Sequence, residues 1–165
     1  MQLRKLLRAT ILVGSSWRTL DGSPPQLYGH RGEKVLMPEH TVPGYELASI
    51  LGADYVEPDL CMTKDDVFVC HHDIDLRDGT DVKDRPEFDH LKRKTDDGYN
   101  WFIRDFTIAQ LKTLRIIQQN IGIRPQDFNS YFTIPTFVEY LGTIHRMTFK
   151  LNRTVGKCYL LNRQT

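Results

Sequence analysis

Two carboxylates stand two positions apart in a short and otherwise mostly apolar segment, residues 55–61 (Tyr-Val-Glu-Pro-Asp-Leu-Cys). Because side chains alternate between the two faces of a β-strand, Glu57 and Asp59 share one face. Two acidic side chains on one face are poorly suited to a core and well suited to holding a cation. Pro58 has no amide hydrogen, so it predicts a strand end or a bulge at this point.

A second strand is predicted close behind the first. Residues 63–66 (Thr-Lys-Asp-Asp) are typical of a turn, and residues 67–72 are again typical of a strand. The connection is too short for a helical crossover, so the two strands should pair antiparallel. A loop centred on the two aspartates predicts that Asp59 lies opposite His72, with Glu57 one step further along the same face.

A strand and a helix are predicted before this pair. Residues 26–30 are short enough for a first strand. Thr41 and Pro43 are typical of a helix start, residues 45–51 supply the helical body, and Gly52 is a C-terminal stop.

Two later segments carry capping boxes. The first joins Thr107 to Gln110, and apolar residues then recur at helical spacing over residues 108–117, which predicts a helix there. The second box, at residues 136–139, predicts a helix through Leu141.

Residues 73–106 form a long, charged segment without periodicity. Loops longer than ~12–15 residues in a compact domain are either functional lids or disordered. Tyr99, Trp101 and Phe102 predict that this one packs down, either as an aromatic plug in the core or against a substrate.

The composition favours one globular domain, because 165 residues with 40% hydrophobic and 26% charged residues suffice for a core. The net charge of +1 gives no electrostatic basis for nucleic-acid binding. No apolar run approaches the ~18 residues of a membrane helix. Cys61, Cys70 and Cys158 lack the CxxC spacing of zinc or redox sites. The register above places Cys61 opposite Cys70, in a contact that we interpret as packing rather than a disulfide.

We divide the chain into residues 1–25, 26–142 and 143–165. The first is a leader or linker with basic residues and a short apolar stretch at residues 9–14. This stretch is shorter than the ~7–15 apolar residues of a signal-peptide core. Secretion and a cytoplasmic location therefore both stay open. The last segment is a basic tail.

In their order and spacing, these motifs resemble the glycerophosphodiester phosphodiesterase family, most closely its larger secreted bacterial and plant-type members. The resemblance extends from about Leu27 to Leu141. The matching segments are His30-Arg31-Gly32, Pro38-Glu39-His40-Thr41, Gly52-Ala53-Asp54 leading to Glu57 and Asp59, Thr63-Lys64-Asp65-Asp66 leading to His72-Asp73, Asp105-Phe106-Thr107, and Ile134-Pro135-Thr136-Phe137.

The resemblance implies a TIM-type (β/α)8 barrel that hydrolyses glycerophosphodiesters to glycerol 3-phosphate and an alcohol, with a divalent metal, calcium or magnesium. Carried over by motif, His30 and His72 match the acid/base pair, and Arg31 matches the phosphate-binding arginine. Glu57 and Asp59 match two metal ligands.

Physical chemistry agrees with these roles. A metal and a guanidinium counter the charge of an anionic phosphodiester, and two imidazoles can exchange protons near neutral pH. Which histidine is the acid and which the base stays open. Glu39, which either orients Arg31 or caps the helix, and Asp73 are expected to be supporting residues, whereas His40 and His71 are expected to be non-catalytic.

Two features depart from the family. A complete barrel needs ~250 residues, and only about 140 follow residue 25, so we expect roughly half a barrel with open sheet edges. The resemblance also implies a third metal-binding glutamate in a Glu-x-Lys strand, but no Asp or Glu follows Glu139. We therefore expect a weak metal site and weak or absent activity.

Two other functions stay open. The chain can be a non-catalytic fragment that acts as a binding module or completes a barrel with another chain. A related metal-dependent phospholipase is the other alternative, although no amphipathic lipid-binding helix is evident. The alcohol and the oligomeric state are not predicted.

Overall fold

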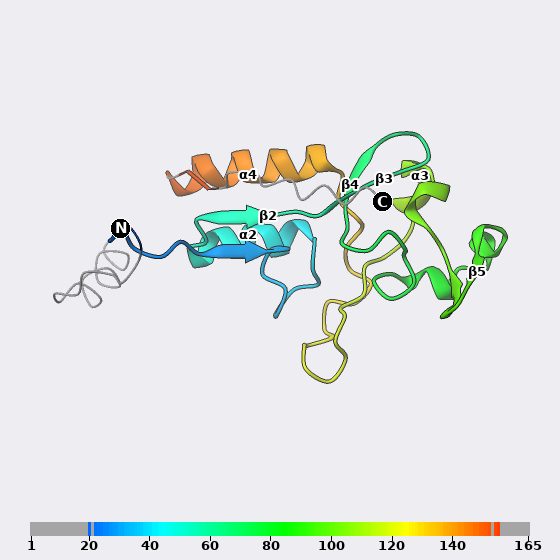
Figure 1. Ribbon diagram of the computed structural model, residues 1–165. Helices are drawn as coiled ribbons and strands as arrows, with labels where there is room; N and C mark the ends of the chain where they lie inside the picture. Colours follow the sequence, from blue (N-terminus) through cyan, green and yellow to red (C-terminus); the bar gives the residue numbers. More distant parts are fainter. Residues whose placement is uncertain (1–19, 21, 153, 156–165) are drawn as a thin grey trace.

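A β-α-β unit begins the fold. The computed structural model describes residues 20, 22–152 and 154–155. Strand β1 (Tyr28–His30) pairs in parallel with β2 (Tyr55–Glu57), and helix α2 (Val42–Leu51) connects them (Figure 1). The Thr41 hydroxyl caps α2 and Gly52 ends it in the left-handed conformation, at φ 110°, as the sequence predicts.

The two faces of the β1–β2 pair differ in character. A Cβ built on Gly29 would lie 3.0 Å from that of Ala48 in α2, so this face of β1 lies directly against the helix. Tyr28 and Tyr55 stack on the opposite face, with ring centroids 4.5 Å apart. Tyr28 remains 47% exposed, because no further strand covers this face within the described residues.

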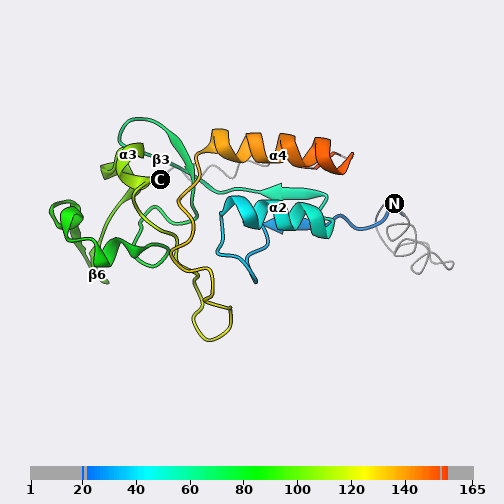
Figure 2. The ribbon, with the colours of Figure 1, turned by 180° about the vertical axis from the view of Figure 1, so that it is seen from behind.

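Helix α4 (Phe137–Leu151) lies beside α2 in both views (Figure 1, Figure 2). The rings of Tyr45 and Tyr140 meet edge to face at 4.8 Å in the core between them. The predicted capping box of Thr136 and Glu139 is present. The helix continues ten residues beyond the predicted end at Leu141, because its apolar face goes on packing through Ile144 and Met147.

Strands β3 (Leu60–Met62) and β4 (Phe68–Cys70) pair antiparallel, as predicted, but the predicted register is wrong by one residue. Cys61 lies opposite Val69 rather than Cys70, and no disulfide joins the two cysteines. The reason is the turn. Asp66 adopts a left-handed conformation (φ 61°) and closes a three-residue loop between Thr63 and Val67.

Residues 73–106 are ordered around a second core. They form three short 3-10 helices (Asp81–Asp84, Pro86–Leu91, Ile103–Asp105) and the hairpin β5–β6 (Arg93–Thr95, Gly98–Asn100). Trp101 is buried and its indole N–H donates to the Phe88 carbonyl at 2.9 Å. Of the two roles predicted for these aromatic residues, Trp101 has the first, because its side chain packs in the core.

Helix α3 (Ile108–Leu111) is much shorter than predicted. The capping box of Thr107 and Gln110 is present, but the helix ends after one turn. Ile116 leaves the helical path because its backbone bonds to Phe132 and Ser130 instead. Leu111 and Leu114 are both fully buried, so the single helical turn and the non-helical turn after it together place the apolar residues of this segment in the core.

The described part of the chain thus contains an α/β unit and three two-stranded sheets, which is consistent with an incomplete barrel. Most of the predicted leader, residues 1–25, and the end of the predicted tail lie outside the described residues. None of the described helices has the length and apolar character needed to cross a bilayer.

Candidate active site

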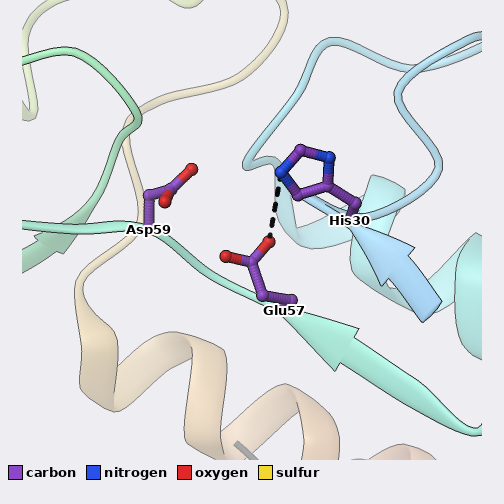
Figure 3. A group of neighbouring side chains, drawn as sticks. All are labelled: His30, Glu57 and Asp59. Carbon is purple, nitrogen blue, oxygen red and sulfur yellow. Dashed lines mark ion pairs between the residues drawn. The ribbon is translucent and has the colours of Figure 1, made fainter. Parts of the chain in front are cut away.

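His30 and Glu57 end the two parallel strands side by side. The β1–β2 register pairs His30 with Glu57, so both side chains emerge at the carboxyl end of the sheet. The imidazole Nε2 of His30 lies 3.9 Å from Glu57 Oε2 (Figure 3). This is the edge at which parallel α/β folds gather their functional groups.

Asp59 joins this pair because the strand breaks at Pro58, as predicted. Strand β2 ends at Glu57 and β3 begins at Leu60. One ligand atom each from His30, Glu57 and Asp59 all lie within 4.8 Å of one another (Figure 3). Both carboxylates are buried, at 6% and 5% exposed.

Arg31 lies between two carboxylates. Its Nη1 donates to Glu39 at 3.1 Å, so Glu39 orients Arg31 while the Thr41 hydroxyl caps α2. The Nε of Arg31 forms an ion pair with Asp59 Oδ2 at 3.3 Å, and this buried Nε has no hydrogen-bond partner within residues 22–152. The contact predicted as one of two alternatives for Glu39, with Arg31, is present, and the cap of α2 is Thr41.

The loop that carries Arg31 is held in an uncommon backbone conformation. Arg31 and His40 both have positive φ, at 64° and 56°, and the His40 amide donates to the Arg31 carbonyl at 3.0 Å. Gly32, at φ 84°, passes so close to Gly44 that an added Cβ would lie 2.9 Å from its carbonyl carbon. Non-glycine residues adopt this region only at a cost, which fixed tertiary contacts must offset.

His72 lies beside the cluster, just past the end of β4. Its Nδ1–H donates to Asp73 Oδ1 at 2.7 Å, which leaves Nε2 as the acceptor of the neutral ring. When it is protonated, the ring of His72 acts to lower the pKa of both Glu57 and Asp59. The amide of the preceding residue, His71, donates to the Asp59 carbonyl at 3.2 Å, but His72 is not one of the three residues whose ligand atoms lie within 4.8 Å of one another.

The ring of His30 has the opposite proton arrangement. The Lys34 ammonium lies 3.1 Å from Nδ1 of His30 and can only donate, so the proton of the neutral ring is on Nε2, facing Glu57. Burial first, and then the charges of Lys34 and Arg31, lower the pKa of His30.

The environments of the two carboxylates push their pKa values apart. Burial, and then the charge of Asp59, raise the pKa of Glu57. Burial opposes ionisation of Asp59 as well, but the hydrogen bond from His40 and the nearby positive charges outweigh it and lower its pKa. Such divergence is common among interacting groups at functional sites.

A divalent cation fits the donor set. Among the residues that the structure describes, the buried Oε1 of Glu57 has no hydrogen-bond partner, and an unpaired carboxylate oxygen in a buried site is costly. With its proton on Nε2, His30 presents a donor rather than a lone pair to the cluster. Glu57 and Asp59 are therefore the two groups that would hold a cation, and oxygen ligands suit calcium or magnesium.

Two residues from a distant loop complete the surroundings of the site, and sequence reasoning missed both. Gln118, only 1% exposed, donates to the carbonyls of Met37 and Lys34 at 3.0 and 3.4 Å. Arg124 is on the same loop as Gln118, and its Nη1 lies 3.8 Å from Glu39 Oε2. This loop runs beside residues 31–40 in Figure 2. No motif or periodicity marks either residue.

These features agree with what the chain resembles. The sequence profile of the glycerophosphoryl diester phosphodiesterase family matches residues 30–158, and the chain belongs to this family. The glycerophosphodiester phosphodiesterase GDPD6 of Arabidopsis thaliana is 42% identical over 128 residues, which cover 75% of this chain and 34% of that protein. A glycerophosphodiester phosphodiesterase of Haemophilus influenzae is 30% identical, over 92% of this chain and 44% of its own length.

Solved structures share the fold. A phosphodiesterase of Oleispira antarctica, in complex with the product sn-glycerol-3-phosphate, superposes with a TM-score of 0.57 at 25% identity, over 82% of this chain and 43% of that one. A glycerophosphoryl diester phosphodiesterase of Parabacteroides distasonis gives 0.59 at 20% identity, over 90% of this chain and 42% of that one. The fold is therefore part of a TIM-type barrel, and the chain spans less than half the length of these relatives.

Proposed function

We propose that this chain carries the acid/base and metal-binding residues of a hydrolase that cleaves glycerophosphodiesters to glycerol 3-phosphate and an alcohol. The observation that supports it most is the approach of His30, Glu57 and Asp59 to within 4.8 Å at the carboxyl end of two parallel strands. The product bound to the Oleispira protein supports the same substrate class. The reaction would belong to lipid and glycerol metabolism.

Glu57 and Asp59 would hold calcium or magnesium, and Arg31 would bind the phosphate from the side of Asp59. A bound cation would counter the phosphate charge and stabilise the negative charge that develops during attack on phosphorus. Two carboxylates alone should hold a hard cation weakly, so we expect low activity from the chain by itself.

The two histidines would divide the proton transfers. Because Asp73 fixes the proton of His72 on Nδ1, the Nε2 lone pair would accept a proton from the attacking hydroxyl. His30 would act in its protonated form: its Nε2–H faces Glu57 and would pass to the leaving alkoxide, which returns the ring to the neutral state. Each histidine then needs to exchange its proton with solvent or product before the next turnover.

The test is release of choline from glycerophosphocholine by the purified chain, with calcium or magnesium and with EDTA. We expect metal-dependent release that is lost in His30→Ala and in His72→Ala and kept in His145→Ala, an exposed histidine of α4. Release that survives in both histidine variants would overturn the roles assigned here. Absence of release at high protein concentration would overturn catalysis by this chain and favour the non-catalytic binding module.

A further inference from the structure

His40 is built into the site although it is not one of the acid/base histidines. Its side chain is only 2% exposed. The ring Nδ1 lies 2.8 Å from the Tyr45 hydroxyl, and Nε2 lies 3.3 Å from Asp59 Oδ2. Both ring nitrogens therefore have a partner, and one of these partners is a candidate metal ligand.

The directions of the two hydrogen bonds follow from the chemistry of the partners. An ionised carboxylate only accepts, so Nε2–H of His40 donates to Asp59 and Nδ1 accepts from the Tyr45 hydroxyl. Tyr45 is fully buried between α2 and α4. The ring is thus held at both ends, and turning it over would leave buried polar groups unpaired.

The bond from His40 is the one that sets the direction of the Asp59 carboxylate. Arg31 also approaches Oδ2, at 3.3 Å, but its Nε lacks hydrogen-bond geometry. Within the described part of the chain, no other side chain donates a hydrogen bond to this carboxylate. Oδ1 is therefore the oxygen left for a ligand.

The backbone at His40 indicates that this placement is maintained at a cost. The residue has a φ of 56°, in the left-handed region, and its amide is bonded to the carbonyl of Arg31. A non-glycine residue in this region is retained where surrounding contacts determine it, and such residues gather at functional sites. A residue needed only to fill the core would not require this conformation.

We propose that His40 is a positioning residue that holds the Asp59 carboxylate beside Glu57 and His30. This inference rests on the metal role proposed for Glu57 and Asp59. Loss of a hydrogen-bonding partner that orients a metal ligand typically costs 10–100-fold in metal affinity. His40→Leu, which keeps much of the volume and removes the donor, is expected to lower calcium affinity about tenfold or more.

Calorimetric titration of the whole chain with Ca²⁺ tests this effect. His40→Gln places an amide N–H near the position of Nε2 and should recover most of the lost affinity, whereas the control His145→Leu should match the wild type. Equal calcium affinity in wild type and in a folded His40→Leu protein, with folding checked by circular dichroism, would overturn the positioning role. A wild type that binds no calcium would instead overturn the metal site of the proposed function.

A second measurement needs neither metal nor turnover. Two-bond ¹H–¹⁵N correlation spectra report which ring nitrogen carries the proton, and the His40 signals are identified by their loss in His40→Gln. We expect a proton on Nε2, and ring shifts that change in Asp59→Asn. A proton on Nδ1, or ring shifts that do not respond to Asp59→Asn, would show that His40 does not hold Asp59.

Discussion

The hydroxyl of Tyr140 donates a 2.6 Å hydrogen bond to the carbonyl of Val56, the residue before Glu57. Tyr140 is 1% exposed, so helix α4 fixes the end of β2 through a bond that water cannot replace. Tyr140→Phe leaves this carbonyl unpaired and should lower the free energy of unfolding by about 1–3 kcal/mol. Urea denaturation measures this loss of unfolding free energy. The control is Tyr131→Phe, which should change the stability little because Tyr131 is 72% exposed.

Asp73 is expected to act through His72. Asp73→Ala removes the acceptor of the Nδ1–H bond, so the ring can turn and present the wrong tautomer. We expect kcat to fall roughly ten- to a hundredfold with little change in KM, and Asp73→Asn, which keeps an acceptor, to retain part of the activity. Asp89→Asn on the surface is the matched control. A fall in Asp73→Ala that appears only in KM would contradict this role.

The sequence predicts the parts of the site that depend on local rules. Strand alternation and the break at Pro58 bring together Glu57 and Asp59, whereas the parallel pairing that adds His30 is seen only in the structure. Irregular backbone conformations do not follow from these local rules. The register error depends on the left-handed conformation of Asp66, which no alternation pattern encodes.

Contacts over long sequence distances also lie beyond such rules. Gln118 bonds to carbonyls more than eighty positions earlier, through a loop without periodicity. Helix α3 ends at Leu111, and Ile116 takes backbone partners in residues 130–132 instead of continuing the helix, which the apolar spacing of residues 108–117 does not indicate. The fold class and the approach of Glu57 to Asp59 were therefore predictable, and the contacts that surround these two residues were not.

Gly32 should tolerate no side chain. Its φ of 84° disfavours alanine, and a Cβ would lie 2.9 Å from the carbonyl carbon of Gly44. Gly32→Ala should therefore lower the free energy of unfolding by at least about 2 kcal/mol. Gly98→Ala, with φ 111° and no atom near the Cβ, isolates the backbone cost. Equal losses at Gly32 and Gly98 would contradict the close approach to Gly44.

Gly142→Ala, in the open helical surface of α4, should stabilise by about 0.5–1 kcal/mol.

Glu139 predicts a pH-dependent contribution to stability. Burial opposes its ionisation, but Lys112 and the amide of Thr136 outweigh that effect, so the pKa of Glu139 lies below its ordinary value. A depressed carboxyl pKa gives stabilisation that is present above the unfolded-state value, about 4.3, and is lost as the pH falls through the folded-state value. Glu139→Gln should therefore be less stable than the wild type at pH 7, and the difference should shrink towards pH ~3. Urea denaturation at both pH values measures this difference in stability. The control is Asp66→Asn, which removes the exposed ion pair of Asp66 with Arg104. A difference that grows as the pH falls would mean that the capping carboxylate is neutral in the folded protein at neutral pH.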